Sequence, residues 1–263
     1  MALKIMGHGI RHVTDQEVMN TATPAATKTH FPFPHGLLLK ETEKLIDQIG
    51  YEVLESAHAL GKEDQTYFGQ YRLKSHINAT EEWSPMLGIR NAHDKTMSLG
   101  LVAGKQTTVC SNLLFLGDFK FTRKHTRNAF SDALDGMAST FGRLPAIDEY
   151  VGKRIEAFKE VPVNDDRDVS KFILEAAHRN LIAPNVTVGV WKEWTAPTYD
   201  DFKTRNLWSL VNSFTTVQGG KNYSPFKIAT DTLKLNEYIN EVFGEQLVTD
   251  AMPDLEHEDT EEY

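Results

Sequence analysis

Between residues 51 and 73 the chain reads YEVLESAHALGKEDQTYFGQYRL, and this pattern predicts a β-hairpin. Two runs of strand-forming residues, 51–60 and 66–73, flank the polar turn GKEDQ. Side chains alternate between the two faces of a strand. One face of the second run would carry Tyr67, Gly69, Tyr71 and Leu73, and the other Phe68, Gln70 and Arg72. The hairpin therefore starts an antiparallel sheet.

The chain that follows extends this sheet. Residues 86–90 (MLGIR) and 96–103 form a second pair of strands around the turn NAHDK, and residues 106–111 form a third strand after a turn at Gly104. Strands that follow one another with short connections favour an antiparallel sheet. We therefore expect the sheet to span residues 51–111.

From Arg127 onward the hydrophobic period changes from two to 3.6. Apolar side chains at helical spacing are Ala129, Phe130, Ala133, Leu134, Met137, Ala138 and Phe141. Gly142 and Pro145 should end this helix. Further helices are expected at residues 37–48, 146–159, 168–180, 200–216 and 230–243. A β-rich first half before an α-rich second half predicts the α+β class, with the sheet backed by the helix near Arg127.

The two ends of the chain differ from the body. Residues 1–35 show no sustained periodicity and are interpreted as an extended N-terminal arm, either exchanged between two copies of the chain or lying on the surface. Residues 36–247 would form a single α+β domain. Residues 248–263 are too acidic and too poor in apolar side chains to pack, so a disordered tail is expected.

Composition excludes several classes of protein. The longest apolar runs are far shorter than the ~18 residues that a membrane span needs, and the N-terminus lacks a secretory apolar stretch. A single cysteine, Cys110, excludes an internal disulfide and a cysteine-based zinc site, and suits a reducing cytoplasm. The sequence lacks the usual nucleotide-binding, hydrolase and metalloprotease motifs, and its ten histidines show no convincing metal spacing. We therefore expect no cofactor and no metal.

Most of the net charge of -9 lies at the C-terminal end. Residues 250–263 carry seven of the 37 acids and no Lys or Arg, which leaves 30 acids against 28 bases elsewhere. Residues 119–128, in contrast, contain no acid. Their candidate nucleic-acid-binding residues are Lys120, Arg123, Lys124, His125 and Arg127, with Phe119 and Phe121 for base stacking. An alternative of equal weight is that the two phenylalanines pack in the core and that the Lys, Arg and His side chains form a solvated surface.

The acidic end resembles the tails of phage and bacterial single-stranded DNA-binding proteins. Its docking residues would be Asp254, Glu256, Glu258, Asp259, Glu261, Glu262 and Tyr263. The resemblance implies docking of replication, recombination or transcription proteins and competition with DNA for the basic groove. A generic solubilising tail is the alternative interpretation.

A polar pocket is a second candidate site. His93, Asp94, Cys110 and His125 could supply a base, a carboxylate and a nucleophile, with Asn112 beside them. The same residues have simpler explanations, because Asn and Asp favour turns and a lone cysteine is usually a small buried side chain. Catalysis on a nucleic acid or nucleotide thus remains an alternative, and binding is favoured.

Four short elements, in this order, resemble the family known as domain of unknown function 932. They are NAHDKTMSL from Asn91, TVCSN ending at Asn112, RKHT from Arg123 and NLWSLVNSFT from Asn206. The family motif residues are Asn91, His93, Asp94, Lys95, Cys110, Asn112, Trp208 and Asn212. Lys95 departs from the family pattern, in which glycine is frequent. The resemblance spans residues 36–225 and implies a phage or plasmid origin, hence the cytoplasm of a bacterial host.

Taken together, these features predict a protein of phage or plasmid DNA metabolism that binds single-stranded DNA. The expected partners are single-stranded DNA, proteins docked on the acidic tail and a second copy of the chain, with no membrane.

Overall fold

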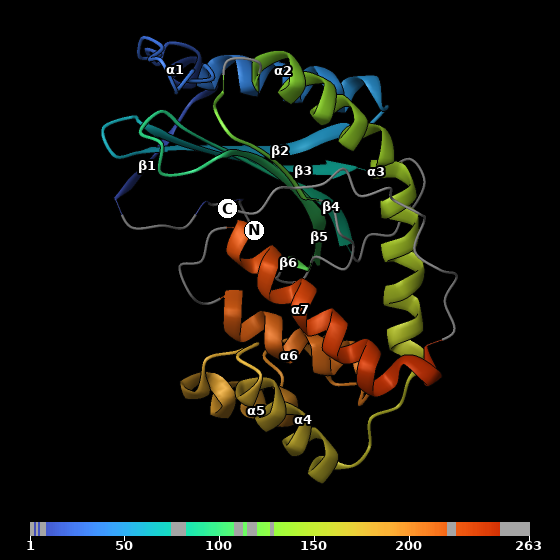
Figure 1. The fold of residues 1–263 in the computed structure, drawn as a ribbon. Coiled ribbons are helices and arrows are strands. Elements are labelled where there is room, and N and C mark those ends of the chain that lie inside the picture. The colour runs from blue at the N-terminus through green and yellow to red at the C-terminus, as the bar shows by residue number, and fades with distance from the viewer. Residues whose placement is uncertain are drawn as a thin grey trace.

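The computed structural model describes residues 3, 5, 9–74, 83–107, 113–114, 120–126, 129–219 and 225–247. It has the expected α+β architecture: a curved antiparallel sheet forms most of the first half, and helices dominate the second half (Figure 1). The proposed tail, residues 248–263, lies outside the described residues.

The sheet is antiparallel throughout. Its strands are β1 (Ile10–Val13), β2 (Glu52–Gly61), β3 (Thr66–Lys74), β4 (Trp83–Ala92), β5 (Leu99–Thr107), β6 (Leu113–Leu114) and β7 (Lys120–Arg123). They are ordered β1-β2-β3-β4-β5-β6, and β7 also pairs with β5. The predicted hairpin is confirmed, since β2 and β3 pair with Leu60 opposite Tyr67. Tyr67, Tyr71 and Leu73 are fully buried, as the alternation of faces predicts.

One strand prediction was wrong. Gly104 does not form a turn, because β5 continues through it and Gly104 lies opposite Met86 of β4. An isolated glycine weakens a strand without ending it when both neighbours keep their ladder pairing. The separate strand expected at residues 106–111 therefore does not exist as such within the described residues.

Three helices lie along one face of the sheet: α1 (Asp15–Met19), α2 (His35–Gln48) and the first part of α3 (Ala129–Glu160) (Figure 1). The expected helix end at Gly142 and Pro145 was wrong, because α3 runs through both residues. Proline removes one backbone donor and bends a helix, but continued burial of an apolar face can keep the helix intact. Phe141, Leu144 and Ile147 provide that face, each at most 4% exposed.

The arm also differs from the prediction, since residues 1–35 contain β1 and α1. Thr14 caps α1 with a capping box, in which its hydroxyl accepts from the Glu17 backbone and Glu17 accepts from the Thr14 backbone. β1 pairs with β2, which attaches this segment to the sheet. A threonine followed three residues later by a glutamate is a local sequence signal for the start of this helix.

The second half is a helical layer that includes α4 (Asp166–His178), α5 (Thr187–Thr195), α6 (Leu207–Gly219) and α7 (Pro225–Phe243), with short 3-10 turns at Pro184–Val186, Asp200–Phe202 and Gly244–Gln246. α7 contacts β5 and β6, α6 contacts β6, and α3 descends beside them (Figure 1). Helix α5 was not predicted. Helix α6 starts later than expected because Asn206 caps it, accepting from the Ser209 backbone at 2.9 Å. Within the described residues no helix is long and apolar enough to cross a membrane.

Candidate functional site

Asn91, near the end of β4, joins three segments of the chain. It is fully buried, and its Nδ2 donates to the carbonyl of Phe33 at 2.6 Å and to Nδ1 of His35 at 2.9 Å. Its Oδ1 accepts from Nε2 of His125 at 2.7 Å. Since Nδ1 of His35 accepts, its Nε2 carries the proton, consistent with a 3.3 Å bond to the carbonyl of Asp64. One amide thus fixes two imidazole tautomers.

His93 adds a second layer to this cluster. Its ring stacks on His35 with centroids 3.8 Å apart, and its Nε2 donates to the same Phe33 carbonyl at 2.9 Å. Its backbone accepts from Nε2 of His30 and donates to the carbonyl of Gln65. Nδ1 of His93 is buried without a hydrogen-bond partner among the described residues. We call His30, His35, Asn91, His93 and His125 the histidine cluster.

The three shifted imidazoles of this cluster are neutral near pH 7. Burial lowers the pKa of His35 to about 3, and the neighbouring imidazole of His93 lowers it further. Burial likewise lowers the pKa of His125 to about 4, with His30 and His93 adding to the effect. The pKa of His93 is also lowered by burial. These three side chains therefore act as a neutral hydrogen-bonded support rather than as a cationic phosphate site.

The histidine cluster brings four turns and loops to one end of the sheet. The Phe31 amide donates to the His125 carbonyl, and Arg123 lies opposite Leu99 in the β5–β7 ladder. The β2–β3 turn joins through the bond between Gln65 and His93. This arrangement gathers exposed cations from four segments, which we call the basic end: Lys28, Lys62, Lys95, Arg123 and Lys124.

Three carboxylates temper the positive charge of the basic end. The Asp94 carboxylate is 3.1 Å from Nζ of Lys62, the Asp64 carboxylate is 3.0 Å from the guanidinium of Arg11, and Glu63 is exposed in the same turn as Lys62. Lys95 has a positive φ of 65°, so the turn requires a residue in the left-handed region there. This explains why glycine suits the position, and the lysine occupies it at a conformational cost.

The structure separates the predicted nucleic-acid-binding residues. Arg123 and Lys124 are exposed, whereas His125 is buried against Asn91. Phe121 is half-buried, and its ring fills the space beside Gly136 of α3, where a Cβ would overlap it. Phe121 is thus placed for packing rather than for base stacking. Phe119 and Arg127 lie outside the described residues, and of Lys120 only the backbone, paired with Val102, is described.

The alternative catalytic pocket is assembled only in part. His93 and His125 belong to one cluster, but the Asp94 carboxylate is directed to Thr96, whose backbone and hydroxyl donate to it, and to Lys62. Cys110 and Asn112 lie outside the described residues. Among the described residues no three His, Cys, Asp or Glu side chains could hold a metal ion.

Trp208 and Asn212, the Trp–Asn motif of α6, stabilise the helical layer. Trp208 is 7% exposed and packs edge-on against Phe202, as expected for a core residue. Asn212 donates to the Trp208 carbonyl within α6 at 2.9 Å. These two residues therefore stabilise a helix of the second half rather than extend the histidine cluster. The tail residues from Asp254 to Tyr263 lie outside the described part of the chain.

Sequence reasoning missed a buried ion pair between the sheet and α3. Nζ of Lys105 is 2.5 Å from Oδ1 of Asp148 and 3.1 Å from the centre of the Trp83 ring. The Tyr51 hydroxyl donates to the other carboxylate oxygen at 3.2 Å. Burial lowers the pKa of Lys105 to about 8, against the opposing effect of Asp148. A lysine in a strand gives no local signal that its partner lies 43 residues away.

His30 and His35 were also missed as members of a cluster. They bracket Phe31-Pro-Phe-Pro, and this proline-rich segment was the available signal, because prolines hold a chain extended. Their partners in the cluster, His93 for His30 and Asn91 for His35, lie 63 and 56 residues away.

Comparison with known proteins places the chain in a family. No curated protein and no solved structure shows significant similarity to it. The family model described as Domain of unknown function (DUF932) matches residues 27–221, which include both the histidine cluster and the Trp–Asn motif of α6. The chain therefore belongs to this family, the domain of unknown function 932.

Proposed function

We propose that the protein binds single-stranded DNA through the basic end. The observation that carries the proposal is the convergence of exposed cations from four segments of the chain at one end of the sheet. Phosphate contacts by Lys and Arg supply most of the affinity for a nucleic-acid backbone. The half-buried Phe31 belongs to this end and replaces Phe121 as the candidate for base stacking.

The histidine cluster supports this function mechanically. Its hydrogen bonds tie the segments that carry Lys28, Lys95 and Arg123 to the end of β4, so the spacing of the cations is set before DNA binds. Pre-ordered contacts avoid the cost of immobilising flexible side chains and loops on binding. Its shifted imidazoles, being neutral, leave the phosphate contacts to Lys and Arg.

The acidic tail completes the proposal. Seven acids in residues 250–263, joined to the domain, would compete with DNA for the basic end and dock proteins of replication or recombination. The role that we assign is in the DNA metabolism of a phage or plasmid, in the cytoplasm of its bacterial host.

Fluorescence anisotropy with a labelled oligo(dT) and a labelled duplex, at low and moderate salt, tests the proposal. The double variant Arg123→Ala/Lys124→Ala should bind oligo(dT) at least ~10-fold more weakly and flatten the log–log salt slope by about 1.4, since each lost contact removes about 0.7 for single strands. Lys192→Ala/Lys203→Ala removes the same charge from exposed positions in the helical layer. An equal loss in this control, or no binding of oligo(dT) by the wild type, would reject the proposal.

A further inference from the structure

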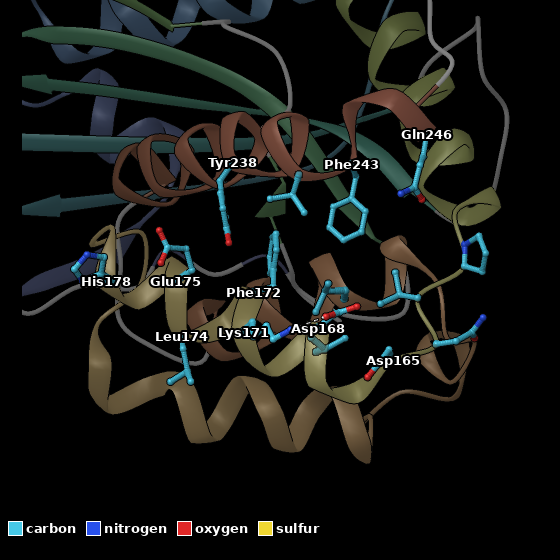
Figure 2. Close-up of a pocket in the computed structure, with 16 residues that line it drawn as sticks. Asp165, Asp168, Lys171, Phe172, Leu174, Glu175, His178, Tyr238, Phe243 and Gln246 are labelled. Atoms are coloured by element: carbon cyan, nitrogen blue, oxygen red, sulfur yellow. Dashed lines mark hydrogen bonds and ion pairs between the residues drawn. The ribbon is translucent and has the colours of Figure 1, made fainter.

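A groove lies between α4 and α7, in the helical layer. It has a volume of about 970 Å³, and Phe172, Tyr238 and Phe243 form its aromatic wall (Figure 2). Phe172 stacks on Tyr238 with ring centroids 4.4 Å apart, and the Phe243 ring is 5.7 Å from that of Phe172. Figure 2 shows the Tyr238 hydroxyl directed from α7 toward α4, into the space between the two helices. The wall is therefore apolar, with a polar group inside the groove.

An exposed apolar side chain extends this wall to the surface. Val242 on α7 lines the groove and is 46% exposed. Leu174 on α4 is 63% exposed, but Figure 2 shows it directed away from α7, on the other side of α4 from Phe172. Large apolar side chains left in water beside an aromatic-lined groove are typical of a surface that a partner covers.

The charged side chains that line the groove are mainly acidic. They are Asp165, Asp168 and Glu175, against Lys171 and the histidine His178. Asp165 caps α4 by accepting from the Arg167 backbone, and Asp168 pairs with Lys171 at the surface. Glu175 pairs with Arg179, whose guanidinium lies over the Tyr238 ring. An apolar wall with an acidic border is complementary to a ligand that is apolar on one side and cationic on the other.

We propose that this groove binds a basic amphipathic helix of a partner protein. Leucine-like side chains at positions i, i+3, i+4 and i+7 would contact Val242 and Phe243, and flanking Lys or Arg would face Asp165 and Asp168. Charge complementarity favours this occupant over the chain's own acidic tail and over DNA, which the same carboxylates would repel. The proposal is independent of DNA binding, because the basic end is built from the sheet and its loops.

A fluorescein-labelled 18-residue peptide, with leucine at helical spacing and lysine elsewhere, is the probe. The matched peptide carries glutamate in place of every lysine. We expect anisotropy titration of the full chain to show saturable binding of the lysine peptide that weakens with salt, and at least ~10-fold weaker binding of the glutamate peptide.

Two variants and two matched controls locate the site. Val242→Asp and Asp168→Lys should each weaken binding of the lysine peptide at least ~10-fold. Val188→Asp is the control for the first, because Val188 on α5 is also an exposed helical valine and does not line the groove. Asp200→Lys is the control for the second, because Asp200 is likewise an exposed acid paired with a lysine three residues later. The controls should change the affinity less than ~2-fold.

Several outcomes would overturn the proposal. They are equal binding of both peptides, absence of binding, or an equal loss in the control variants. Sedimentation of the protein alone tests another occupant, because a dimer that Val242→Asp converts to monomer would assign the groove to a second copy of the chain. Binding of oligo(dT), measured for the same variants, should remain unchanged, which separates failure of this site from failure of the basic end.

Discussion

Nε2 of His125 donates to Oδ1 of Asn91 at 2.7 Å, a bond between fully or nearly buried side chains 34 residues apart. It ties the segment after β7 to the end of β4. Because Arg123 and Lys124 directly precede His125, this bond fixes the backbone that presents two exposed cations. The buried support and the proposed DNA-binding surface are therefore parts of one arrangement.

Asn91→Ala should destabilise the fold by about 3 kcal/mol or more, because it leaves the buried Nε2–H of His125 and the other polar groups at Asn91 without partners. Urea denaturation followed by circular dichroism measures this loss. Asn20→Ala, which removes an exposed bond to Gln16, is the control and should cost less than ~0.5 kcal/mol. Equal effects of the two variants would contradict the role given to Asn91.

Acid should destabilise the protein through the histidine cluster. The folded-state pKa values of His35, about 3, and His125, about 4, lie below the ordinary value of 6.5, so between these limits the unfolded chain binds more protons. The free energy of unfolding should therefore rise as the pH increases from about 3 to about 6.5. The same stability is lost when the pH falls through that range.

Urea midpoints measured across this pH range test the prediction. His125→Gln keeps an amide donor for Asn91 but cannot titrate, so its profile should be flatter than that of the wild type. His178→Gln changes an exposed histidine and should leave the profile as it is. Parallel profiles for all three proteins would show that His125 does not contribute to the pH dependence of stability.

Asp148→Asn should destabilise the protein by about 3–5 kcal/mol, because it leaves the buried ammonium of Lys105 without its counter-ion. The double variant Lys105→Met/Asp148→Leu removes both charges and should recover much of this loss. A double-mutant cycle by urea denaturation gives the coupling between the two residues. Additive losses would mean that the pair does not act as a unit.

Two glycines of α3 should respond to alanine in opposite directions. A Cβ at Gly136 would overlap the Phe121 ring, so Gly136→Ala should cost about 1–3 kcal/mol. Gly142 has open space around its Cβ position, so Gly142→Ala should stabilise the helix by about 0.5–1 kcal/mol. Thermal unfolding of both variants checks the pair, and a stabilised Gly136→Ala would show that Phe121 does not fill that space.

Removing residues 248–263 should tighten binding to oligo(dT), with the largest effect at low salt, because the tethered acids no longer compete for the basic end. Anisotropy titrations of the full chain and of a chain ending at Leu247 make the comparison. A variant with Asp254, Glu256, Glu258 and Asp259 changed to Asn or Gln keeps the length of the tail and should show part of the same gain. Unchanged affinity on truncation would exclude competition by the tail.

Local patterns predicted the elements whose signals are local. Alternation in residues 51–73 predicted the β2–β3 hairpin, and the change of period after Arg127 predicted the start of α3 near Ala129. Thr14 and Glu17 carry an equally local signal for α1, the capping box. The end of α3 could not be predicted from neighbouring residues, because burial of Ile147 and Val151 against the rest of the fold keeps the helix intact past Pro145.

The sequence by itself determined the α+β class, the hairpin and the position of the acidic tail, since periodicity and charge are properties of neighbouring residues. Only the tertiary structure decided that Asn91, His35 and His125 meet, that Phe121 packs on Gly136, and that Lys105 finds Asp148. These contacts join residues 15 to 56 positions apart, and one sequence contains no record of which distant residues face each other. That pairing follows from how the helices cover the sheet, because side chains there must bury apolar area and satisfy their hydrogen bonds together.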